Sequence, residues 1–109
     1  MNLKTNVTSG AVNSLLGTLL LASCMSANAN LDLADKHACL NCHSVAKKMV
    51  GPAFKDIAAK YKDRKDAAEY LAGKISKGST GAWGAIPMPP MASVPASDVE
   101  ALTAWIRNL

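Results

Sequence analysis

Cys39-Leu40-Asn41-Cys42-His43 is the stretch that decides the fold, because it specifies the group around which the chain packs. Two cysteines separated by two residues and followed at once by histidine form the attachment pattern for haem c. The two thiols add across the haem vinyl groups and become thioethers, and the adjacent histidine lies under the iron and coordinates it. The spacing therefore predicts one covalently bound haem held by Cys39 and Cys42, with His43 as an axial iron ligand.

Two other kinds of site share part of this pattern. A thioredoxin-like dithiol also has Cys-x-x-Cys, but it occurs in a βαβ context, and this chain shows no alternating strand pattern. A zinc site needs four ligands, and the only other histidine, His37, would crowd all four into one short stretch. Both stay as alternatives to haem attachment. We expect His37 to be an exposed helix residue rather than a second iron ligand.

Upstream of the motif the chain begins with a leader. Lys4 precedes an apolar run at 11–22, and Ala27-Asn28-Ala29 matches an A-x-A cleavage site. We therefore expect residues 1–29 to be a signal peptide and residues 30–109 to be the mature domain.

The leader also contains a cysteine in an unusual context. Leu21-Ala22-Ser23-Cys24 resembles a bacterial lipobox, in which the cysteine becomes lipidated. Cleavage after Ala29 is the favoured interpretation, and a membrane tether through Cys24 is the alternative.

Length and composition indicate one small domain that needs a cofactor. The chain has 109 residues and a net charge of +4. Basic residues alternate with acids and form no stripe with aromatic side chains, so nucleic-acid binding is excluded. A large, flat, apolar cofactor would complete a core that has few aromatic side chains. Those available are Phe54, Tyr61, Tyr70, Trp83 and Trp105.

Apolar residues at helical spacing predict four short helices. They are expected at residues 31–38, 52–61, 66–77 and 97–109. Ser97 and Glu100 have the spacing of a capping box for the last helix.

Residues 78–95 are expected to form an irregular loop, because glycine and proline recur too often for a helix or strand. The loop holds Met88 and Met91, and a thioether is the usual second axial ligand in His/Met haem proteins. On spacing alone these two methionines are nearly equivalent candidates. Met49 follows His43 closely and is expected to pack in the core.

Beyond Cys39–His43, two further segments carry a family resemblance. They are Lys48-Met-Val-Gly-Pro-Ala-Phe54 and Lys77-Gly-Ser-Thr-Gly-Ala-Trp-Gly-Ala-Ile-Pro-Met-Pro-Pro90. Together they resemble the short bacterial class I cytochromes c over about residues 31–109. The resemblance implies an all-α fold, with about four short helices around one covalently bound haem. It makes residues 30–109 a cytochrome c domain.

The resemblance also implies roles for particular residues. It assigns the second iron ligand to Met88 rather than Met91. It makes the Pro52 carbonyl the acceptor of a hydrogen bond from the proximal imidazole. It places Trp83 beside the haem, within reach of a propionate, and Lys74 near a propionate, although a solvated lysine is the alternative there. Many relatives have asparagine where this chain has Met91, which has no hydrogen to donate to the ligand sulfur.

The function implied is outer-sphere transfer of single electrons in the periplasm by a monomer. With both axial positions filled, no open site is left for substrate chemistry, so no enzyme activity is expected. The implied partners are a cytochrome cd-type nitrite reductase, a terminal oxidase or a quinol-oxidising complex.

Partners would dock at an exposed haem edge. Lys47, Lys48 and Lys55 are candidates for steering an acidic patch, or else simply solvated. A gas sensor or minor peroxidase is a second function, if Met88 dissociates easily. A haem-free dithiol protein is a third.

Overall fold

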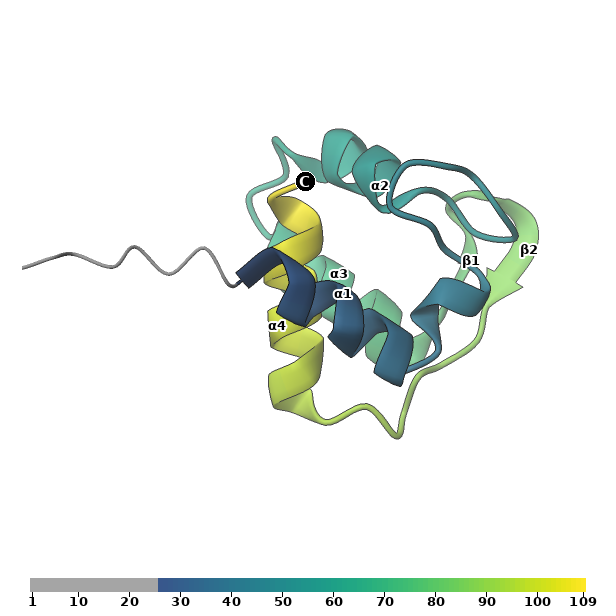
Figure 1. Ribbon diagram of the computed structural model, residues 1–109. Helices are drawn as coiled ribbons and strands as arrows, with labels where there is room; N and C mark the ends of the chain where they lie inside the picture. Colours follow the sequence, from purple (N-terminus) through teal and green to yellow (C-terminus); the bar gives the residue numbers. More distant parts are fainter. Residues whose placement is uncertain (1–25) are drawn as a thin grey trace, which may run out of the picture.

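The structure is a computed structural model that describes residues 26–109 (Figure 1). The predictions for the leader, the cleavage site and Cys24 concern residues whose side chains the structure does not describe. Four helices and one small hairpin follow in order. They are α1 (Ser26–Lys36), a 3-10 turn (Cys39–Asn41), α2 (Phe54–Tyr61), α3 (Ala67–Lys77), β1 (Ser79–Gly81), β2 (Gly84–Met88) and α4 (Ala96–Arg107). The predicted all-α fold with four short helices is confirmed.

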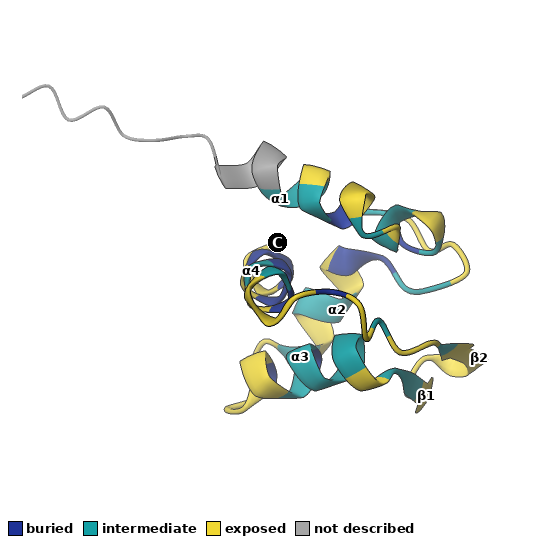
Figure 2. Ribbon diagram, turned by 90° about the horizontal axis from the view of Figure 1, so that it is seen from below, coloured by how far each residue is buried: buried dark blue, intermediate teal, exposed yellow. Residues whose placement is uncertain are grey.

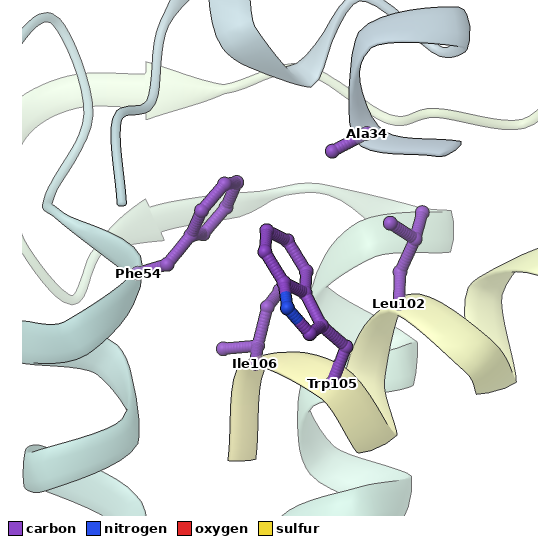
Figure 3. Close-up of a cluster of buried hydrophobic side chains, with 5 residues drawn as sticks. All are labelled: Ala34, Phe54, Leu102, Trp105 and Ile106. Atoms are coloured by element: carbon purple, nitrogen blue, oxygen red, sulfur yellow. The ribbon is translucent and has the colours of Figure 1, made fainter. Parts of the chain in front are cut away.

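The core is built on α4, against which the other three helices pack. Leu102, Trp105 and Ile106 are buried at the spacing that places them on one helix face. They meet Ala34 of α1 and Phe54 of α2 (Figure 3). Burying each large apolar side chain contributes about 1.5 to 3 kcal/mol to folding. In Figure 2 the buried residues accordingly gather on α4 and the start of α2.

The hairpin corrects the prediction of an irregular loop at residues 78–95. β1 and β2 are antiparallel, with Ser79 paired to Met88 and Gly81 paired to Gly84. Gly81 and Gly84 have φ angles of 81° and 113°, which bring the chain round the turn between them. In a hairpin of two strands both strands are edges, where proline is tolerated, so Pro87 does not prevent pairing.

The predicted capping box at the start of α4 was wrong. The helix begins at Ala96, with Pro95 as the N-cap residue and no side-chain cap bond. The Pro95 carbonyl accepts bonds of 3.0 Å from the amides of both Asp98 and Val99. Because the N-cap residue lies two positions earlier than expected, Ser97 is already inside the first turn and cannot cap the helix.

The prediction of an exposed His37 was also wrong. α1 ends at Lys36, and Ala38 has a φ of 59°, so His37 leaves the helix. Its side chain is 13% exposed, and its Nε2 lies 2.7 Å from Asp98 Oδ2 on α4. The histidine lies directly after α1 and therefore links the end of that helix to α4.

Met49 was expected in the core but is 47% exposed. It lies in a tight surface turn in which its own amide donates to the Gly51 carbonyl over 3.0 Å. Within residues 26–109, no helix combines the length and the apolar character needed to cross a bilayer.

Candidate haem site

All the predicted site residues line one apolar cavity. It lies between the attachment segment, α2, α3 and the hairpin, elements that Figure 1 labels, and Leu102 and Ile106 of α4 complete its wall. The predicted residues on its wall are Cys39, Cys42, His43, Pro52, Lys74, Trp83 and Met88. Met91 lines the same cavity. The structure thus brings together residues that are up to half the chain apart.

The His43 ring is fixed by Pro52 and Phe54, and by Gly51, which is described below. Its Nδ1 lies 2.7 Å from the Pro52 carbonyl oxygen, which can only accept, so Nδ1 carries the proton and donates. In the neutral imidazole, Nε2 then has the free lone pair. Phe54 stacks on the ring at 5.1 Å between centroids and an interplanar angle of 21°. Phe54 in turn meets Trp105 edge-on at 5.3 Å, which connects the site to the core.

Gly51 is a site residue that the sequence reasoning missed. A Cβ at this position would lie 2.5 Å from His43 Cε1, a distance that carbon atoms do not tolerate. Only glycine allows the backbone to pass so close to the imidazole. The available signal was the pair Gly51-Pro52, which lies in the segment that carries the family resemblance, where only Pro52 was given a role.

The two cysteines lie at either end of the 3-10 turn and are both free thiols. Burial raises the pKa of the Cys39 thiol above its usual value. A reactive dithiol needs a lowered pKa, so this environment does not suit thiolate exchange. Among residues 26–109, no three His, Cys, Asp or Glu side chains are grouped to hold a metal ion such as zinc.

Met88 ends β2, and the backbone around it is tightly packed. Gly78 has a φ of 80°, and a Cβ there would lie 2.7 Å from the Met88 carbonyl oxygen. Beyond the prolines that follow, the Met91 amide donates to the Ile75 carbonyl over 2.9 Å. Hydrogen bonds to α3 and close packing thus define where the methionine segment leaves the hairpin.

Tyr61, Lys74 and Trp83 line the cavity, and each contacts a further aromatic or basic side chain. Trp83 is 39% exposed and meets Tyr61 edge-on at 6.4 Å. Lys74 Nζ lies 5.0 Å from the centre of the Tyr70 ring. Lys60 Nζ lies 4.3 Å from the Trp83 ring centre, a contact that no sequence pattern indicated.

These residues fit a haem c. The donor set is one imidazole nitrogen with a free lone pair and two thioethers, which are ligands that haem iron takes in cytochromes. Two free thiols lie beside that imidazole, as attachment to two vinyl groups requires. The remaining wall is largely aliphatic and aromatic, as a macrocycle needs.

Comparison with known proteins gives three findings. A family model described as cytochrome c matches residues 32–109. Cytochrome c-552 of Nitrosomonas europaea is 59% identical over 83 residues, which are 76% of this chain and 81% of that protein. Cytochrome c-551 of Allochromatium vinosum is 51% identical over 84 residues, 77% of this chain and 89% of that protein.

The similarity extends to a solved structure. The crystal structure of wild-type Nitrosomonas europaea cytochrome c552 matches with a TM-score of 0.70 at 59% identity. The match covers 72% of this chain and 98% of that chain. Both the sequence and the backbone of this chain are therefore similar to those of the Nitrosomonas europaea cytochrome.

Proposed function

The chain belongs to the cytochrome c family, and on that premise we propose that Cys39 and Cys42 hold its haem while His43 and Met88 ligate the iron. The protein carries single electrons through one covalently attached haem c, with the His/Met ligation characteristic of the family. The assignment of these roles to particular residues is the proposal.

The observation that carries the assignment is the 2.7 Å bond from His43 Nδ1 to the Pro52 carbonyl. It selects the tautomer whose Nε2 can bind iron, and it holds the ring in one orientation. A polarised Nδ1–H also makes the imidazole a stronger donor to the metal. Pro52 thus acts through His43 rather than by touching the iron.

Met88 is the proposed ligand on the other side of the cavity. It is partly buried, lines the cavity and stands at the end of a strand. Pro87 and Pro89 flank it and restrict the unfolded chain, which lowers the entropy lost when the loop orders. Met91 lies farther along, after the chain has turned back to α3.

Trp83 and Lys74 are proposed to hold the haem propionates. An indole N–H and an ammonium group are donors, and both side chains line the cavity. Lys74 lies against Tyr70, which restricts the lysine side chain beside the cavity.

The residues around the cavity suit electron transfer rather than substrate chemistry. When bound, the haem supplies an iron atom that gains or loses one electron. His43 and Met88 would fill both axial positions, so no coordination site is left for a substrate. We therefore propose that the protein has no enzyme activity.

An exposed apolar edge beside the cavity is the proposed docking edge, made of Met49, Val50 and Ile86, which are 47%, 54% and 66% exposed. Lys47 and Lys48 flank it and are exposed, as is Lys55. Apolar contact with a basic rim suits brief docking to an acidic redox partner. A nitrite reductase, a terminal oxidase or a quinol-oxidising complex are the proposed partners. Replacing both flanking lysines by glutamate should slow the reaction with such a partner most at low salt.

Export to the periplasm is proposed from the leader at residues 1–29, with residues 30–109 as the mature cytochrome c domain. We propose that the mature protein is a monomer that binds no nucleic acid. Lipidation of Cys24 is the alternative that would tether it to a membrane.

The experiment that tests the site uses absorption spectra of the protein matured with haem. We expect a thioether–iron charge-transfer band in the ferric form, lost in Met88→Ala and kept in Met91→Ala. A denaturing pyridine spectrum should report thioether-linked haem. Loss of the band in Met91→Ala alone would assign the ligand to the other methionine. A ferric wild type without the band would favour the gas sensor or peroxidase.

A further inference from the structure

The hairpin of β1 and β2 has little of its own to hold it in place. None of its residues is buried. An isolated hairpin of two strands is at best marginally stable in water. Among residues 26–109, no helix packs extensively against either strand. Because β2 ends at Met88, any contact that fixes the hairpin also fixes Met88.

Two residues at the end of α2 contact the tip of the hairpin. The Tyr61 ring meets Trp83 edge-on at 6.4 Å, and Lys60 contacts both residues of the turn. Lys60 Nζ donates to the Ala82 carbonyl over 2.9 Å. The same ammonium group lies 4.3 Å from the centre of the Trp83 ring. Ala82 and Trp83 are the two residues of the turn between β1 and β2. The Lys60 side chain therefore contacts both residues of the turn.

The base of the hairpin has a separate anchor. Gly78 packs against the Met88 carbonyl, and the Met91 amide is bonded to the Ile75 carbonyl. The base is thus tied to α3 and the tip to α2. If the tip were released, the strands would keep their base anchor and could move away from the cavity as a pair.

We propose that Lys60 is a positioning residue which, by clasping Ala82 and Trp83, holds the hairpin in place and slows the release of Met88 from the iron. This inference rests on the proposed ligation by Met88. Lys60 acts through the hairpin and does not touch the iron.

Both contacts of Lys60 are at the surface, which sets the size of the effect. An exposed cation–π contact and a hydrogen bond from a charged donor are each modest in water. Removing both together should speed opening of the hairpin about fivefold. The effect should shrink only slightly in salt, because one of the two contacts is a short hydrogen bond.

The test compares three variants of the ferric holoprotein. Lys60→Ala removes both contacts and keeps a good helix former in α2. Lys62→Ala is the matched control, since Lys62 is exposed, carries the same charge and lies two residues along. Lys60→Arg should restore both contacts, because a guanidinium group also donates hydrogen bonds and stacks on an indole ring. The first readout is the rate at which cyanide displaces the thioether ligand, followed as loss of the thioether band. The second is hydrogen exchange of the backbone amides of residues 79–86 and 88.

We expect Lys60→Ala to accelerate both readouts about fivefold, with Lys62→Ala and Lys60→Arg close to wild type. Equal rates in Lys60→Ala and wild type would overturn the proposal that Lys60 holds the hairpin. The proposal would also fail if Lys62→Ala accelerated both readouts as much as Lys60→Ala. If the wild type shows no thioether band, ligation by Met88 fails instead. Hydrogen exchange then still decides whether Lys60 holds the hairpin.

Discussion

The two sides of the cavity are held in different ways. His43 is 8% exposed, and its ring is fixed by Pro52, by Phe54 and by the close approach of Gly51. Met88 belongs to a hairpin without a buried residue, anchored only at its tip and base. One proposed ligand thus packs against the core through Phe54, whereas the other belongs to a surface element.

This difference indicates which part of the molecule opens first by local unfolding. Local opening is easiest in segments with few buried apolar contacts and exposed backbone hydrogen bonds. The hairpin meets that description, and the segment around His43 does not. Perturbing the His43 side should therefore cost global stability, whereas perturbing the Met88 side should loosen a ligand.

The largest expected effect is on the His43 side, from Gly51→Ala. Its Cβ would lie 2.5 Å from His43 Cε1, and the stacked ring cannot move aside. We expect a loss of about 2 to 3 kcal/mol in the free energy of unfolding, as for overpacking in a core. Denaturant unfolding of the holoprotein measures it.

Gly73→Ala is the matched control, because nothing lies within 4 Å of the added Cβ and the position is inside α3. It should stabilise the protein by about 0.5 to 1 kcal/mol. Equal effects of the two substitutions would contradict the tight fit around His43.

On the Met88 side, Gly78→Ala should act differently. The position has a φ of 80°, and the new Cβ would meet the Met88 carbonyl oxygen at 2.7 Å. Because no helix among residues 26–109 packs extensively against the strands, the hairpin can shift to relieve the clash. We expect a smaller loss of stability, about 1 to 2 kcal/mol, together with a weakened thioether band.

The proposed difference between the two sides would be wrong if Gly78→Ala left the thioether band intact and lowered the free energy of unfolding more than Gly51→Ala does. Denaturant curves and ferric spectra of the two variants, recorded side by side, decide this.

The smallest effect is expected at the pair between His37 and Asp98, neither of which lines the cavity. The hydrogen bond from His37, with Lys36 3.7 Å away, lowers the pKa of the Asp98 carboxyl. A carboxyl with a lowered folded pKa contributes stability above its unfolded pKa and loses it as pH falls through the folded value. Asp98→Asn should thus be less stable than wild type at neutral pH.

The gap between Asp98→Asn and wild type should close in acid, because the wild-type carboxyl is then protonated as well. Thermal unfolding at several pH values measures this. A gap that stays constant into strong acid would show that the carboxylate charge contributes nothing.

Sequence patterns predicted the parts of the molecule that depend on neighbours in the chain. Cys39, Cys42 and His43 lie close together in the chain, and helical periodicity predicted the helix at residues 97–109, in which Leu102 and Ile106 are buried. These features follow from local spacing, which a single sequence displays directly. The family resemblance added Pro52, and the structure places its carbonyl on His43 Nδ1.

The parts that were missed depend on contacts between distant segments. His37 and Asp98 are 61 residues apart, and Lys60 and Ala82 are 22 apart. No local pattern distinguishes such lysines and histidines from solvated ones. The hairpin was missed because proline usually excludes strands, and only the backbone shows that both strands are edges.

The most direct test of the account is a titration of the ferric holoprotein with imidazole, followed by absorption and proton NMR. We predict that the thioether band disappears while the His43 Nδ1 proton, bonded to the Pro52 carbonyl, keeps its resonance. Met88 would then be the ligand that exchanges and His43 the one that stays. Loss of the His43 resonance while the band persists would contradict the account.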